Sequence, residues 1–100
     1  MTTDSTATDQ AVGGRAIITV LGSDRPGIVA AVAGALSERE ANILDISQTI
    51  LQGTFTMTML VALAGAEFSE LKSTLDALAE RLGVQINLQR EEVFKFMYRL

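Results

Sequence analysis

The sequence predicts an α+β fold in which the elements follow the order β-α-β-β-α-β. Three observations support this order: apolar β-branched runs mark strands, two stretches follow helical periodicity, and a Gln-Gly pair joins the two middle strands as a hairpin. Two right-handed crossovers joined through a hairpin give a four-stranded antiparallel sheet with both helices on one face. The expected architecture is therefore a ferredoxin-like sandwich, followed by a short C-terminal helix.

The first strand and the first helix are predicted from the stretch 15–42. Residues 15–22, "RAIITVLG", are apolar on both faces, which is typical of a central strand. From Ile28 the apolar residues follow helical spacing, with alanines and Gly34 between them, so this helix is thin enough to lie close to a sheet. Asn42 is expected to mark its end.

The segments 42–51 and 54–64 are predicted to form a hairpin around the turn Gln52-Gly53. In this register Leu51 pairs with Thr54, and one face of the hairpin becomes the core face. That face collects Leu44, Ile46, Ile50, Phe55, Met57, Met59, Val61 and Leu63. The other face is mixed and carries Ile43, Asp45, Ser47, Thr49, Thr54, Thr56, Thr58, Leu60 and Ala62. Gln48 is polar on the core face, so either a bulge shifts it or its amide reaches a partner at the sheet edge.

The remaining segments complete one domain over residues 15–100. An amphipathic stripe predicts a second helix over 67–82, with Gly83 as its stop, and clean alternation predicts a strand over 84–90. The ending "EEVFKFMYRL" predicts the short terminal helix. Residues 1–14 contain almost no large apolar side chain, so they are expected to form a disordered tail.

Composition excludes several classes of function. The chain has no cysteine and no histidine, which removes thiol chemistry and the commonest general base and metal ligand. Its net charge is −4 and it has no basic run, so nucleic-acid binding is not expected. No apolar run is long enough to span a membrane, and the first residues do not resemble a signal peptide. We therefore expect a cytoplasmic protein that is not an enzyme and holds no metal or cofactor.

The stretch "LGSDRPGIVAAVAG" places four turn-prone residues between the first strand and the first helix. Asp24 is expected to cap the helix, and Pro26 suits a first helical turn because it has no N–H to leave unpaired. Gly27 lets another backbone or a small ligand come close. The N–H groups at the helix start suit a carboxylate. A well-capped helix start with no further role explains the same residues.

The motif Asp-Arg-Pro-Gly-Ile-Val after an apolar strand, followed by Ala-Asn-Ile at the next strand, resembles the ACT domain over about residues 15–92. The stretches "LDISQTIL" and "FKFMYRL" resemble small free-standing ACT proteins of bacteria and archaea. The resemblance implies a homodimer that binds an amino acid between its subunits. It implies one wall formed by Ser23, Asp24, Arg25, Pro26, Gly27 and Ile28, and another formed by Asn42 and Ile43 on strand two of the neighbour.

Two functions remain open from the sequence. The first is a regulatory module that binds an amino acid or a similar metabolite and acts on a separate partner protein. The alternative is a structural or adaptor dimer with no ligand. In both cases a dimer is expected, because the open sheet face would expose Ile43, Leu60 and Ala62.

Overall fold

The computed structural model describes residues 14–23 and 26–98. Its elements follow the predicted order with the predicted terminal helix. They are β1 (Arg15–Ser23), α2 (Ile28–Glu38), β2 (Asn42–Leu51), β3 (Thr54–Ala62), α3 (Phe68–Leu82), β4 (Gln85–Arg90) and α4 (Glu91–Tyr98). Residues 1–13 of the expected tail lie outside the described residues, whereas the Gly14 carbonyl accepts a hydrogen bond from the Leu63 N–H at 2.9 Å.

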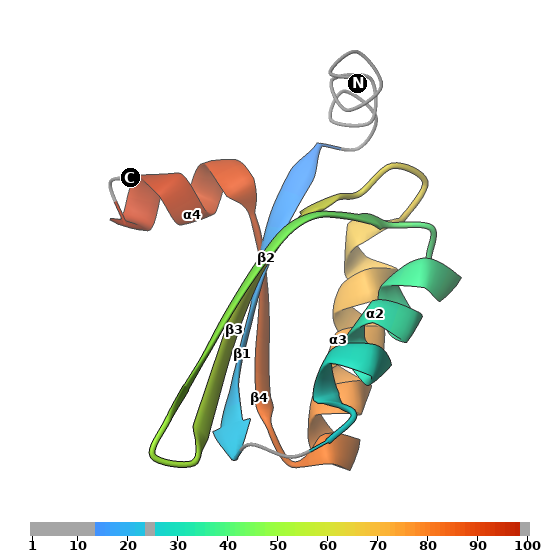
Figure 1. The fold of residues 1–100 in the computed structure, drawn as a ribbon. Helices are drawn as coiled ribbons and strands as arrows, with labels where there is room; N and C mark the ends of the chain where they lie inside the picture. The colour runs from blue at the N-terminus through green and yellow to red at the C-terminus, as the bar shows by residue number, and fades with distance from the viewer. Residues whose placement is uncertain (1–13, 24–25, 99–100) are drawn as a thin grey trace.

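The four strands form one sheet in the order β2-β3-β1-β4, and every neighbouring pair is antiparallel. Helices α2 and α3 lie together on one face, and α4 projects on the opposite side (Figure 1). This arrangement confirms the ferredoxin-like sandwich. It also makes β2 and β4 the edge strands, so the apolar first strand lies in the centre as predicted.

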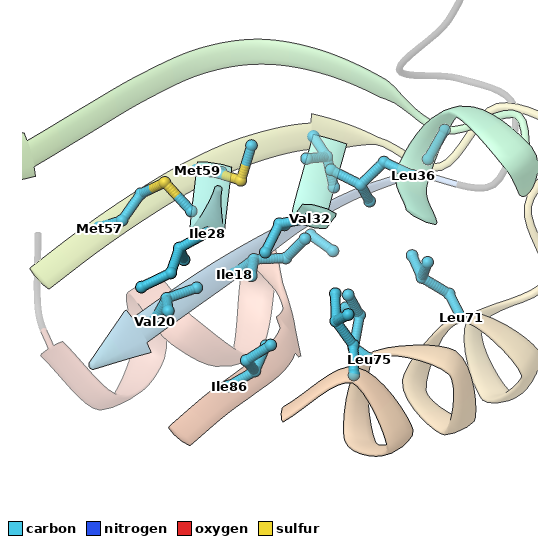
Figure 2. Packing of buried hydrophobic residues seen from close by; sticks show 14 of the residues in the cluster. Ile18, Val20, Ile28, Val32, Leu36, Met57, Met59, Leu71, Leu75 and Ile86 are labelled. Atoms are coloured by element: carbon cyan, nitrogen blue, oxygen red, sulfur yellow. The ribbon is translucent and has the colours of Figure 1, made fainter. Parts of the chain in front are cut away.

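The core fills the space between the sheet and the two covering helices. Alternate residues of β1, β3 and β4 point into this layer and meet the apolar stripes of α2 and α3 (Figure 2). The labelled members are Ile18, Val20, Ile28, Val32, Leu36, Met57, Met59, Leu71, Leu75 and Ile86. The methionines on β3 are fully buried, as their place on the core face predicts.

The hairpin register is confirmed near the turn and corrected near its open end. Leu51 pairs with Thr54 and Ile50 with Phe55, and this register continues as far as the pair Asp45 and Leu60. A bulge between Ile43 and Asp45 then places Ile43 opposite the buried residue Val61. Ile43 therefore lies on the helix side rather than on the open face, where the unbulged register put it.

The burial of β2 was predicted wrongly. Ile46 and Ile50 share the side of the sheet that faces the helices, yet they are 40% and 57% exposed. The cause is the position of β2. It is an edge strand, and toward the hairpin turn it runs away from α2 (Figure 1). On the opposite face Ala62 is fully buried, so the expected open patch of Ile43, Leu60 and Ala62 does not form.

Helix α4 is tied to the start of β1 by an ion pair. Arg15 Nε donates to Glu91 Oε1 at 2.9 Å, and Arg15 Nη2 pairs with Glu91 Oε2. Lys95 Nζ lies 3.4 Å from the same carboxylate. Burial raises the pKa of Glu91, but the hydrogen bond and charge of Arg15, with the charge of Lys95, outweigh it and hold the pKa below its usual value of 4.5.

This ion pair predicts an acid-sensitive helix. Because the folded-state pKa of Glu91 is lowered, its contribution to stability is complete above pH 4.5 and is lost as the pH falls through the folded-state value. In Glu91→Gln we expect faster amide hydrogen exchange in α4 at neutral pH, because the free energy of opening this helix should fall by about 1 kcal/mol. In wild type the free energy of opening α4 should fall as the pH drops below 4.5, and Glu91→Gln should not show this fall. Glu92→Gln, on the exposed side of α4, is the control and should behave as wild type.

Candidate ligand site at the start of α2

Gly27 is the N-cap of α2 and has φ +91° and ψ −5°, in the left-handed region. The expected roles of its neighbours change accordingly. Pro26 lies in a turn before the cap, not in the first helical turn, and the capping position belongs to Gly27 rather than to Asp24. Asp24 and Arg25 lie outside the described residues. Glycine adopts the left-handed conformation without a steric cost, so this conformation alone explains why position 27 is a glycine.

The end of β1 that precedes this loop also requires a glycine. Ser23, the last residue of β1, is exposed and pairs with Thr54. A Cβ placed on Gly22 would lie 2.6 Å from Val84 Cγ1, so the connection between α3 and β4 packs directly on the backbone of β1. The two glycines that flank the loop therefore serve different purposes: close packing at Gly22 and backbone conformation at Gly27.

A cavity of about 610 Å³ opens between the first turn of α2 and the hairpin of β2 and β3. It is lined by Gly27, Ile28, Val29, Ala30, Gln48, Ile50 and Phe55. Ile28 and Phe55 are buried and form apolar surface beneath it. The first N–H groups of a helix have no acceptor four residues earlier, and they carry the positive end of the helix dipole. The cavity thus combines an electropositive backbone edge with apolar walls.

The two predicted walls of the site lie apart within one chain. Gly27 and Ile28 lie at the start of α2, whereas Asn42 and Ile43 line a separate hollow of about 240 Å³ beyond its end. The bulge in β2 turns Ile43 toward this second hollow, where it lies near Leu36. Asn42 and Ile43 therefore cannot complete the first cavity of their own chain. Only those residues of a second copy can form the wall that the ACT resemblance implies.

Five lining residues were not among the predicted site residues: Val29 and Ala30 of α2, and Gln48, Ile50 and Phe55 of the hairpin. The sequence carried one signal for them, because Gln48 was polar on a face that was otherwise apolar. The bulge lies between Ile43 and Asp45, so it does not move Gln48 off that face. Gln48 therefore stays on the helix side of the edge strand β2, where it is exposed and lines the cavity.

The described residues carry no group of three or more histidine, cysteine, aspartate or glutamate side chains placed to hold a metal ion. Within the same part of the chain, each helix is too short or too polar to cross a membrane. None of the described residues that line the cavity is titratable. The described part of the cavity can therefore contact a ligand through backbone N–H groups, one side-chain amide and apolar surface.

Comparison with known proteins gives the family. The model of the ACT domain matches residues 15–89. A UPF0237 protein of Methanocaldococcus jannaschii is 48% identical over 88 residues, which are 86% of this chain and 98% of that protein. An ACT domain protein from Streptococcus pneumoniae has a TM-score of 0.71 and 43% identity, covering 81% of this chain and 93% of the other.

A regulatory chain is also among the similar solved structures. The regulatory subunit of aspartate kinase from Thermus thermophilus, in a ligand-free form, has a TM-score of 0.61 and 28% identity. The match covers 75% of this chain and 49% of that subunit. The similarities to the archaeal and bacterial proteins agree with the resemblance in the loop and in the second strand. The chain belongs to the ACT domain family, with UPF0237 proteins of bacteria and archaea among its relatives.

Proposed function

We propose that this chain is a regulatory module that binds an amino acid, or a similar small metabolite, at the start of α2. ACT domains are generally regulatory modules that bind small molecules. The observation that carries the proposal is the cavity of about 610 Å³ beside the first turn of α2. Its size lies within the range of small-ligand pockets, and its lining combines the first backbone N–H groups of α2 and one side-chain amide with apolar surface. We assign the chain no catalytic activity.

In the proposed complex the carboxylate of the ligand lies against the first N–H groups of α2. Ser23, Asp24, Arg25, Pro26, Gly27 and Ile28 form the wall around this group. Asn42 and Ile43 of a second copy form the wall that closes the site. Asp24 and the second copy's Asn42 are the candidates to receive the amino group of the ligand.

The experiment that tests the function is calorimetric titration of the full chain with the twenty amino acids, preceded by a thermal-shift screen. A ligand that binds only the folded chain raises its melting temperature, so the screen reports binding directly. We expect a selective rise with one amino acid or a small group of them. If neither the amino acids nor a panel of small metabolites changes the melting temperature or releases heat, the proposal is wrong and the adaptor function takes its place.

The partners in this proposal are a second copy and a separate protein in the cytoplasm. A separate partner is supported by the similarity to the regulatory subunit of aspartate kinase, because that name describes a regulatory chain. The alternative function, an adaptor dimer with no ligand, is favoured by the exposed apolar residues of β2 and by Phe96 of α4, which is 80% exposed. Such surfaces are typical of contacts between proteins.

The dimer is expected to form through the free edge of β2. Among the described strands β2 pairs only with β3, and its exposed apolar side chains include Ile46, Ile50 and Leu51. Light scattering at micromolar concentration should give about twice the mass of one chain. Ile46→Lys should shift the equilibrium toward the monomer, because it places a charge at this edge. Ser73→Lys, on the exposed side of α3, should leave the dimer intact; a wild-type monomer would contradict the prediction.

A further inference from the structure

Gln48 interrupts an apolar row on the helix side of β2. It pairs with the fully buried Met57, and its neighbours on the same side are Ile46 and Ile50. Because alternate residues of a strand share one face, Gln48 lies on the side of the sheet that α2 covers. It is exposed and lines the cavity opposite the first turn of α2.

The surroundings of Gln48 are apolar and uncharged. Ile28, Val29, Ile50 and Phe55 contribute hydrocarbon surface to the cavity. None of the described lining residues can be ionised, so a charged side chain that reaches the β2 end of the cavity gains no counter-ion from them. The Gln48 amide can donate and accept hydrogen bonds, but it cannot neutralise a charge. This end of the cavity therefore suits a ligand group that is apolar, or polar and neutral.

We infer that the cavity selects amino acids with uncharged side chains, and that Gln48 is the residue that sets this selectivity. The inference rests on the proposed function, which places the carboxylate at the start of α2. The ligand side chain then extends toward β2, between Ile50 and Phe55, and ends at the Gln48 amide. A neutral polar end exchanges hydrogen bonds with this amide, and an aliphatic end packs on the apolar walls.

Matched pairs of ligands separate charge from shape. Glutamine and glutamate have nearly the same size, as do norleucine and lysine, so each pair differs mainly in charge. In calorimetric titrations of the wild-type chain we expect the neutral member of each pair to bind more tightly by about tenfold or more. Equal binding of glutamate or lysine would overturn the inference while leaving the proposed function intact. Failure of all four ligands, of the other amino acids and of the small metabolites in the screen would reject both.

A pair of variants tests Gln48 itself. Gln48→Glu keeps the size of the side chain and adds a negative charge, so lysine should gain affinity relative to norleucine by about tenfold or more. Thr56→Glu adds the same charge on the opposite face of the sheet, at an exposed residue of the inner strand β3, so it leaves the free edge of β2 unchanged. It should keep the wild-type preference. The role of Gln48 is rejected if Gln48→Glu keeps that preference too, or if both variants change it equally.

Both substitutions are at exposed positions of the sheet, so we expect both proteins to fold. Light scattering shows whether each variant keeps the oligomeric state of the wild type. Circular dichroism melting curves provide the check. A Gln48→Glu variant with a normal melting curve and unchanged ligand preference contradicts the inference directly. If the melting curve shows that Gln48→Glu is unfolded, Gln48→Leu becomes the deciding variant. Gln48→Leu should keep its affinity for norleucine and bind glutamine more weakly. An equal loss of affinity for both ligands would contradict the role of the amide.

Discussion

Ala30→Trp is expected to abolish ligand binding while leaving the fold intact. Ala30 is exposed on the first turns of α2 and lines the cavity, so an indole at this position fills space that the ligand needs. The methyl group it replaces contributes nothing to the buried core. We expect the affinity for the amino acid found in the screen to fall by about a hundredfold or more, which is about 2.7 kcal/mol.

The control for this prediction is Ser73→Trp, which adds the same side chain on the exposed side of α3. Calorimetric titration of wild type and both variants measures the effect, and their melting temperatures report whether the fold is preserved. Ser73→Trp should bind as wild type does. If Ala30→Trp binds the ligand equally well, the ligand does not occupy the cavity beside α2, whatever its affinity for the chain.

Gly27→Ala is expected to destabilise the protein by about 1–2 kcal/mol, because it forces an L side chain into the left-handed region. The residue has φ +91°, and a Cβ built on it meets no atom of the described residues within 4 Å. Strain in the backbone, not a clash, is therefore the expected cause. In a first helical turn alanine would be the better residue, so the sequence alone suggested that the fold would stay nearly intact. Urea unfolding gives the free energy directly.

Two further variants separate conformation from size. Gly27→Asn has a larger side chain but tolerates the left-handed region better, so it should cost less than Gly27→Ala. Gly34→Ala is the same substitution in the interior of α2, where the added Cβ also meets nothing, and it should stabilise the protein by about 0.5–1 kcal/mol. A larger loss for Gly27→Asn than for Gly27→Ala would show that space, not the dihedral angle, matters at this position.

The sequence predicted the order of elements and most of the core because periodicity carries that information. Alternation identified the buried residues of β3, and the stripe of α3 identified Leu71, Leu75 and Leu78. Periodicity shows which side of a strand faces the helices, but not whether a helix lies above it. For that reason Ile46 and Ile50 were assigned to the core, although an edge position leaves them exposed.

The candidate site was predicted only in part, for two physical reasons. A glycine before a helix fits either a helical or a left-handed conformation, so the role of Gly27 could not be read from its neighbours. The register was counted outward from the turn, and a single bulge reverses the faces of all residues beyond it. Ile43 lies beyond the bulge and was therefore placed on the wrong side. Gln48 was visible as an anomaly, yet only the fold shows that the start of α2 lies opposite it.

The central place of β1 has a consequence for how the domain assembles during synthesis. Of the four strands β1 leaves the ribosome first, but its two neighbours in the sheet, β3 and β4, follow much later in the chain. The edge of β1 that pairs with β4 finds its partner only when Arg90 has emerged, so the nascent domain keeps an unpaired edge on an apolar strand until its last strand is available. Glu91 follows directly and pairs with Arg15, which joins the earliest and the latest parts of the nascent domain.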